Sequence, residues 1–374
     1  MEKKTEYYES GKLKVVYTVD DKGQKNGPEE AYYENGQLMC SCVLKNDKLD
    51  GPKKIFYKNG QLKFQGTYKD GQVDGPYETY YENGQLEYAD NKEDGVCEAY
   101  YENGQLEYRI AYKNGQKNGP YEFYYKGGLL HYKGAFKKGK KNGLCLEYYE
   151  SGKLGIKCAY IDGLKEGLRE HFYENGQLQS QGIYKNDKKE GPFETYYENG
   201  QLKSKGIYKD GKKDGVHESY YKSGQLKSKL TYRDDQENGP FETYHENGQL
   251  KFQGSYTDGK KDSAYVFYYE DGKVKFKGVY KNDKLNGPFE EYYKSGQLAA
   301  KGTFKEDQED GLTEVYYENG QLHLKGMHKE DQKEGPWEEY DEKGNLVKKG
   351  AYVNGKFVPE VPASKNHRAK SRKV

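Results

Sequence analysis

Aromatic and polar residues alternate along the chain on either side of an Asn-Gly pair. In Gly191–Tyr208 the sequence is GPFETYYENGQLKSKGIY. Alternation with a period of two residues is typical of half-buried strands, and Asn-Gly between two such runs is a strong signal for a type I′ hairpin turn. The sequence therefore predicts a β-hairpin whose turn lies at Asn199 and Gly200.

This turn position fixes which residues of the hairpin face one another. Strand side chains alternate between the two faces of a sheet, so one face is apolar and the other is charged. The pairs expected on the apolar face are Phe193/Gly206, Thr195/Ser204 and Tyr197/Leu202. Those expected on the charged face are Tyr196/Lys203 and Glu194/Lys205.

A large ring faces a glycine in many of these units. The pairs include Phe193/Gly206, Phe241/Gly254, Phe289/Gly302 and Trp337/Gly350. A ring that lies over a glycine fills the space of the missing side chain, so we expect these pairs to stabilise their hairpins. Where the glycine is absent the ring is usually absent too, as in Cys145/Cys158.

The hairpin pattern recurs about every 24 residues from about Glu6 to Gly355. Such self-similarity indicates a repeat architecture, with polar connections such as Lys209–Gly215 as surface loops. We therefore predict an all-β fold over residues 1–355, an elongated array of about 14 antiparallel hairpins in one twisted meander sheet. The unit near 85–104 is four residues shorter, which should kink or narrow the sheet near Tyr88–Asp94.

Composition agrees with a shallow core built from tyrosine. The 374 residues include 42 Tyr and 47 Gly, and the formal net charge is +1, so neither a large aliphatic core nor a highly charged disordered chain is indicated. Residues 356–374 are different: they form a basic, proline-containing tail that we expect to be disordered. The chain shows no signal-peptide pattern, and its five cysteines are an odd number for a secreted disulfide scaffold, so we expect a cytoplasmic protein.

The repeat resembles the MORN family, whose short Gly- and Tyr-rich units form antiparallel hairpins in an extended single sheet. The form YYxNGxLxxxxxYxxGxxxG, seen in Tyr196–Gly215, is similar to the bacterial MORN-variant repeat. Proteins built from that repeat are commonly assigned to an antitoxin family of toxin–antitoxin systems. The resemblance therefore implies a toxin as one partner, and it supplies no catalytic residue.

The residues themselves indicate no enzyme, cofactor or metal site. Histidines occupy repeat slots about 10 Å apart, which is too far for shared ligation, and Cys40 and Cys42 lack a second pair at zinc spacing. Cys145 and Cys158 are expected to face each other across two strands. Two packed thiols and a cross-strand disulfide both fit that register.

A tyrosine row on the charged face is the main candidate for binding. Its members are Tyr100, Tyr124, Tyr148, Tyr196, Tyr220, Tyr244, Tyr268, Tyr292 and Tyr316. Each ring either packs against lysine stems or contributes to a long binding strip, and the two interpretations are compatible. The hypothesis is a non-enzymatic scaffold that binds another protein along this face.

Two further partners follow from the sequence. An open row of Phe193, Tyr197, Leu202 and their counterparts would be a large apolar surface, which favours a homodimer through that face. The alternative to protein binding is a membrane-peripheral organiser that places the aromatic face and the basic tail on anionic lipid. Nucleic acid is not favoured, because the basic tail has no interleaved aromatic residues.

Overall fold

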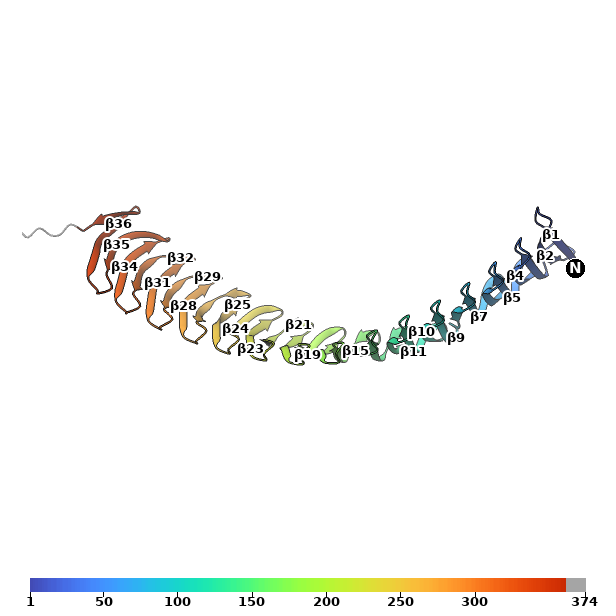
Figure 1. Cartoon of the computed structure of the whole chain (residues 1–374), viewed down its shortest axis with the longest axis horizontal. Helices are drawn as coiled ribbons and strands as arrows, with labels where there is room; N and C mark the ends of the chain where they lie inside the picture. Colours follow the sequence, from blue (N-terminus) through green and yellow to red (C-terminus); the bar gives the residue numbers. More distant parts are fainter. Residues whose placement is uncertain (361–374) are drawn as a thin grey trace, which may run out of the picture. The chain divides into compact units, whose positions relative to one another are not determined.

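All regular elements of the described residues are β-strands. The computed structural model describes residues 1–360, and its 37 strands belong to one antiparallel meander sheet, as predicted. The chain divides into two compact units, the first built mainly from Met1–Lys189 and the second starting at Glu190. In each unit the strands follow one another in chain order (Figure 1).

The first unit contains strands β1 to β18. Their bounds are β1 Glu2–Tyr7, β2 Leu13–Val19, β3 Gly27–Tyr32, β4 Leu38–Lys45, β5 Lys48–Phe56, β6 Leu62–Lys69, β7 Gln72–Tyr80, β8 Leu86–Asp90, β9 Asp94–Tyr100, β10 Leu106–Lys113, β11 Gln116–Tyr124, β12 Leu130–Lys137, β13 Lys140–Lys141, β14 Gly143–Tyr148, β15 Leu154–Ile161, β16 Leu164–Lys165, β17 Gly167–Phe172 and β18 Leu178–Lys185.

The second unit contains β19 to β37. Their bounds are β19 Lys188–Tyr196, β20 Leu202–Lys209, β21 Lys212–Lys213, β22 Gly215–Tyr220, β23 Leu226–Arg233, β24 Gln236–Tyr244, β25 Leu250–Thr257, β26 Lys260–Lys261, β27 Ser263–Tyr268, β28 Val274–Lys281, β29 Lys284–Leu285, β30 Gly287–Tyr292, β31 Leu298–Lys305, β32 Gln308–Glu309, β33 Gly311–Tyr316, β34 Leu322–Lys329, β35 Gln332–Tyr340, β36 Leu346–Val353 and β37 Lys356–Pro359.

The predicted register holds through most of each hairpin and fails beside the loop. Phe193 pairs with Gly206 and Thr195 with Ser204, as expected. A bulge then shifts the register by one residue, so Leu202 pairs with Tyr196 and not with Tyr197. Leu202 therefore shares a face with Tyr196, and the predicted apolar row through Tyr197 and Leu202 is wrong.

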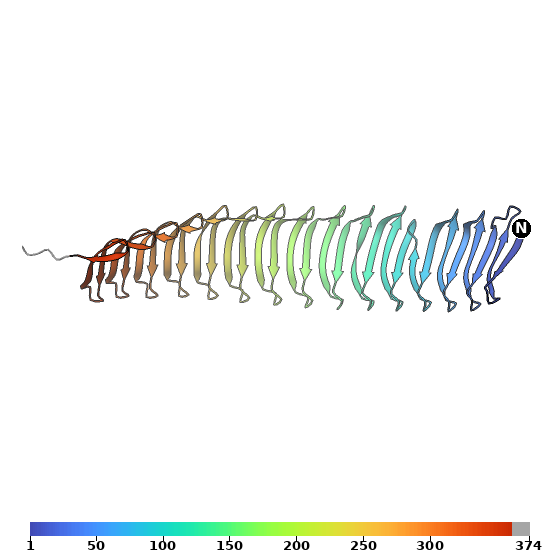
Figure 2. The ribbon, with the colours of Figure 1, turned by 90° about the horizontal axis from the view of Figure 1, so that it is seen from above.

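The type I′ geometry predicted for the Asn-Gly turn is wrong. The Asn-Gly loop is a three-residue loop: at Tyr33–Gln37 the N–H of Gly36 donates to the carbonyl of Tyr33 at 2.8 Å, and Gly36 has a φ of +89°. This is a type I turn closed by a glycine bulge. The type I′ turn lies instead between hairpins, where Asn186 and Asp187 both have positive φ. Figure 2 shows the two kinds of turn on opposite edges of the sheet in each unit.

The short unit narrows the sheet as predicted, whereas the end of the array differs from the prediction. The short unit narrows at its type I′ edge, where β8 has five residues against eight in β6. The array also continues past residue 355, because β37 pairs with β36 through Tyr352 and Phe357. The remainder of the expected basic tail lies outside the described residues.

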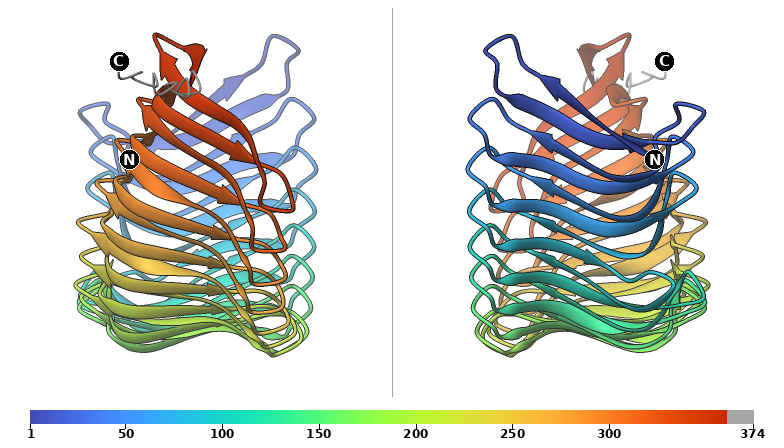
Figure 3. Two further views of the ribbon diagram at one scale, coloured as in Figure 1. Left: turned by 90° about the vertical axis from the view of Figure 1, so that its left-hand side faces the viewer. Right: turned by 90° about the vertical axis from the view of Figure 1, so that its right-hand side faces the viewer.

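One face of the sheet, which we call the ring face, carries rings that are buried by the chain itself. The most buried are Tyr121, Phe241, Tyr265, Phe289 and Trp337, each at most 6% exposed. Neighbouring rings contact one another along the face, as Tyr265 does with Phe241 and Tyr280 in tilted pairs. Lysines from the type I′ edge lie over the rings; Lys261 Nζ, for example, is 5.1 Å from the ring centre of Tyr280. The open apolar row that favoured a homodimer through this face is therefore not present. Figure 3 shows the stacked strands of each unit with turns at both sides.

Candidate functional site

The opposite face, here called the charged face, carries the predicted tyrosine row. Most of the row's hydroxyls are engaged within the repeat, since Tyr220 donates to Glu218 and Tyr292 donates to Glu290, each at 2.5 Å. The same bond from tyrosine to the glutamate two residues earlier is made by Tyr100, Tyr124, Tyr196, Tyr244 and Tyr316. At Tyr268 the hydroxyl instead accepts from Gln253, and Tyr148 follows Leu146 where other repeats have the glutamate.

Lysines of the preceding strand complete this network. Lys277 Nζ contacts Glu290 and the hydroxyl of Tyr292, both at 3.1 Å, and lies 5.1 Å from the ring centre of Tyr292. Lys205 and Lys301 make the equivalent ion pairs, to Glu218 and Glu314. The tyrosine rings thus pack against the stems and charges of neighbouring lysines, which supports the packing interpretation of the row.

The network holds its groups in fixed protonation states. Lys301, the hydroxyl of Tyr316 and Lys325 lower the pKa of Glu314 to about 2. Burial and the hydrogen bond to Glu98 raise the pKa of Tyr100 to about 12. At neutral pH the carboxylates are therefore ionised and the tyrosines are neutral donors, so this surface presents both signs of charge.

Beside the charged network lies a row of exposed aliphatic side chains that the sequence analysis missed. We call it the aliphatic row; its large members are Val96, Leu144, Leu168 and Ile183 in the first unit and Ile207, Val216, Leu312 and Met327 in the second, each 37–54% exposed. Leu168 faces Ile183, and Leu312 faces Met327, so apolar pairs stand directly opposite each other. Strict alternation from Gly206 and Tyr208 places Ile207 on the charged face, so the sequence pattern contained the signal that predicts this row.

Shallow hollows recur where the aliphatic row meets the charged network. One in the first unit, of about 260 Å³, is lined by Pro120, Glu122, Lys133 and Leu144 among others. One in the second unit, of about 310 Å³, is lined by the corresponding residues Pro288, Glu290, Lys301 and Leu312. The same combination of apolar and charged walls therefore recurs along the repeats, as a partner with an extended contact would require.

The two edges of the sheet bond each repeat to the next and so fix this surface. On the Asn-Gly edge, the second tyrosine of each Tyr-Tyr pair donates its hydroxyl to the carbonyl of the first tyrosine, or of phenylalanine in its place, one repeat on. The donors are Tyr8, Tyr33, Tyr57, Tyr81, Tyr101, Tyr125 and Tyr149 in the first unit and Tyr197, Tyr221, Tyr269, Tyr293 and Tyr317 in the second. We call this series of bonds the hydroxyl ladder. It continues through the shortened unit, where the Tyr81 hydroxyl donates to the carbonyl of Tyr100 at 2.8 Å.

His245 stands where this ladder expects a tyrosine. Its Nε2 atom is buried and has no hydrogen-bond partner among the described residues. A histidine side chain is shorter than a tyrosine side chain and has no hydroxyl, so it does not make the bond to the carbonyl of the next repeat. The hydroxyl ladder is therefore incomplete at His245.

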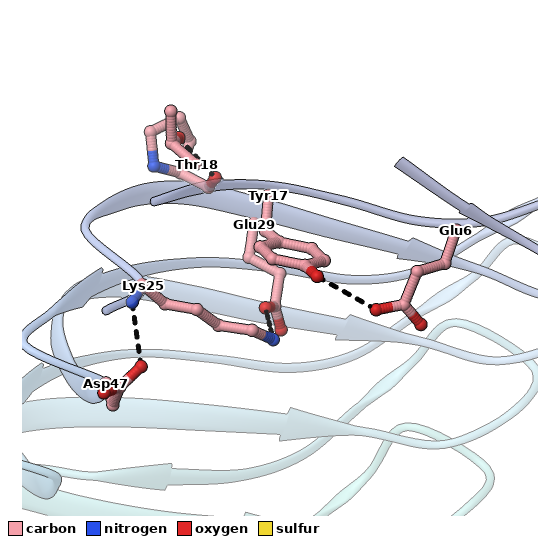
Figure 4. Close-up of polar contacts among 7 residues, drawn as sticks. Glu6, Tyr17, Thr18, Lys25, Glu29 and Asp47 are labelled. Atoms are coloured by element: carbon pink, nitrogen blue, oxygen red, sulfur yellow. Dashed lines mark hydrogen bonds and ion pairs between the residues drawn. The ribbon is translucent and has the colours of Figure 1, made fainter. Parts of the chain in front are cut away.

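On the type I′ edge an aspartate bonds its repeat to the one before it. The backbone N–H of Lys25 donates to Asp47 Oδ1 at 2.8 Å (Figure 4). The N–H of Asp47 donates back to the carbonyl of Lys25. Lys25 also reaches Glu29 and lies over the ring of Tyr17, so its side chain covers the ring face. This reciprocal bond accounts for aspartate at a positive-φ position that glycine otherwise fills.

The remaining predicted residues are where the register placed them. Phe241 faces Gly254, Phe289 faces Gly302 and Trp337 faces Gly350. The nearest ring over a strand glycine often comes from the following repeat, since a Cβ at Gly254 would meet Tyr265 at 2.7 Å. Cys145 and Cys158 pair directly, and both are free thiols. The described residues contain no cluster of three or more metal-binding side chains and no helix able to span a membrane.

The comparisons with known proteins identify the repeat. The profile of the MORN repeat variant matches residues 25–46, 49–70, 73–91, 93–114, 141–162, 165–186, 189–210, 213–234, 237–258, 261–282, 285–306, 309–330 and 333–354. The β11–β12 hairpin, outside these matches, has the same pairing as its neighbours. No curated protein matches the chain.

Among solved structures the likeness is weak. "Crystal Structure of TcdB2-TccC3-TEV" is 10% identical with a TM-score of 0.18, and a structure of the Photorhabdus luminescens Tc holotoxin pore is 10% identical with a TM-score of 0.15. The matches cover 93% and 95% of this chain but 26% and 25% of those chains, so it spans about a quarter of their length. TM-scores this low establish neither a shared fold nor a shared function.

Proposed function

The chain belongs to the MORN repeat variant family, and from this premise we propose that it is a non-enzymatic repeat scaffold that binds another protein along its charged face. The observation that carries the proposal is the distribution of apolar side chains. The ring face is closed by the chain's own lysines, whereas the aliphatic row stays half exposed beside a fixed Tyr/Glu/Lys network. Interfaces commonly combine an apolar centre with a polar rim.

A protein toxin is the partner class favoured by the resemblance to antitoxin repeats. The charged face suits a protein partner because its apolar hollows recur with the repeat and its charges include both signs. We place the complex in the cytoplasm, where free thiols such as Cys145 and Cys158 are ordinarily maintained.

The test replaces two exposed members of the aliphatic row in each of two variants. One variant carries Leu168→Ser with Ile183→Ser, and the other carries Ile207→Ser with Val216→Ser. The matched control is Leu129→Ser, because Leu129 is 48% exposed but lies in an Asn-Gly-type loop and not on the charged face. Partners are captured from the native cell with the unaltered chain, and their affinity is then measured with purified proteins.

Each row variant should weaken the captured partner's affinity at least tenfold, or about 1.4 kcal/mol, while Leu129→Ser leaves it unchanged. Equal affinity for all variants would overturn the proposal. Sedimentation with anionic vesicles that depends on residues 361–374, without any captured protein, would instead support the membrane-peripheral alternative.

A further inference from the structure

The cysteine hairpin differs from the other units at the centre of its ring face. Cys145 on β14 and Cys158 on β15 occupy the positions that hold a ring and a glycine in units such as Phe289/Gly302. Both side chains are buried, and both are free thiols in this structure. The ring face therefore contains two facing sulfur atoms where units such as Phe289/Gly302 contain an aromatic ring.

The missing ring leaves a cavity of about 370 Å³ against the two thiols. Tyr121 and Phe123 of β11 and Tyr160 of β15 line it, and so do the cationic side chains of Lys141 and Arg169. Its volume lies in the range of small-molecule sites, so a peroxide has ample room beside the sulfur atoms.

The surroundings of Cys145 favour its thiolate. A hydrogen bond from Cys158 and another from the hydroxyl of Tyr121, whose oxygen is 3.4 Å from Cys145 Sγ, lower the pKa of the Cys145 thiol with help from the charge on Lys141, and burial opposes them. The same bond to Cys145 raises the pKa of Cys158. The pair thus divides into one nucleophilic sulfur and one protonated thiol.

We propose that Cys145 and Cys158 form a redox site that a peroxide oxidises to a cross-strand disulfide. The Cys145 thiolate attacks one peroxide oxygen and breaks the O–O bond; with hydrogen peroxide and one added proton, the products are a sulfenic acid and water. The sulfur of Cys158 then attacks the sulfenic sulfur, and its proton leaves with the hydroxyl group as a second water. Two cysteines are oxidised by two electrons and one peroxide is reduced.

The strand geometry suits this bond best at Cys145 and Cys158. Directly opposed residues of antiparallel strands have Cα atoms about 4.5 or 5.5 Å apart, well inside the range for disulfides. Cys40 and Cys42 lie two residues apart on β4, where the spacing of about 6.7 Å is at the upper limit of that range. Cys97 faces Ile110 and has no opposing thiol. The three sites form an internal comparison.

The experiment treats the purified full-length chain with hydrogen peroxide and maps its peptides by mass spectrometry without reduction. The expected product is a peptide pair joined through Cys145 and Cys158 that has lost two hydrogen atoms, formed at least tenfold faster than any product at Cys97. Cys158→Ser should halt the reaction at a sulfenic acid on Cys145, trapped by dimedone. Cys145→Ser should leave Cys158 unmodified over the same period.

Three results would overturn the proposal. The first is the absence of the Cys145–Cys158 bond in the oxidised wild-type chain, a measurement that depends on no variant. The second is oxidation of Cys97 as fast as Cys145. The third is a disulfide between Cys40 and Cys42 that forms first, because it would show that opposition across strands is not what selects the pair.

Discussion

The two faces of the sheet deal with apolar side chains in opposite ways. On the ring face Tyr265 is fully buried, because neighbouring rings and Lys261 cover it. On the charged face Ile207 stays 51% exposed beside the Tyr/Glu/Lys network, which recurs with the same repeat period. A single-layer sheet can therefore close one face with its own side chains and leave apolar surface on the other, so the stability of the protein and its binding are expected to depend on different faces.

The largest expected effect tests whether the ring face carries the stability. Phe241→Ala removes a ring that is 3% exposed and packs at 4.9 Å against Tyr256, so it should lower the free energy of unfolding by about 3–4 kcal/mol. The control is Ile207→Ala on the charged face, which should cost under about 1 kcal/mol because its side chain is already half in water. Chemical denaturation compares the two, and similar losses would contradict the division between faces.

A smaller effect concerns the hydroxyl ladder that fixes both faces. His245→Tyr should restore the missing bond at the one ladder position where a histidine stands, and should raise the free energy of unfolding by about 1 kcal/mol. Tyr221→Phe removes the 2.8 Å bond to the carbonyl of Tyr244 and should lower it by a similar amount. Hydrogen exchange localises both changes. A destabilised His245→Tyr chain would show that the slot is shaped for histidine.

The smallest effect belongs to the charged face alone. Because the folded pKa of Glu314 is about 2, below its ordinary value of 4.5, its ion pairs contribute stability above pH 4.5 and lose it as the pH falls towards 2. Glu314→Gln should therefore differ from the unaltered chain by about 0.5 kcal/mol at pH 6, and the difference should vanish near pH 2. Urea titrations of both chains across this range measure it, and a difference that persists at pH 2 would point to packing instead of charge.

The sequence predicted the meander and most of the register because alternation and the 24-residue period are properties of neighbouring residues. Phe193 opposite Gly206 followed from counting back from the loop. The predicted turn type was wrong, because Asn-Gly suits both a type I′ turn and a type I turn with a glycine bulge. The two turns differ by one unpaired residue. That residue decides whether Leu202 lies with Tyr196 or Tyr197.

The candidate surface was less predictable than the fold. Closure of the ring face depends on lysines such as Lys261, which reach rings on two neighbouring strands. The alternation of residues within one hairpin does not predict contacts of this kind. The same limit hid the hydroxyl ladder, whose donors and acceptors are mostly 23 residues apart. The exposed aliphatic row follows from the alternation of the strands, which places Ile207 on the charged face.

Trp337 offers the most direct test of the central claim that the chain closes its ring face unaided. It is the sole tryptophan of the sequence, is 1% exposed, and lies beneath Lys333 Nζ, 4.4 Å from the ring centre. The measurement is its fluorescence and acrylamide quenching across a dilution series, with the mass followed by light scattering. We expect blue-shifted emission and slow quenching in the monomer at every concentration. Red-shifted, readily quenched emission in the monomer that becomes protected only as a dimer forms would contradict it.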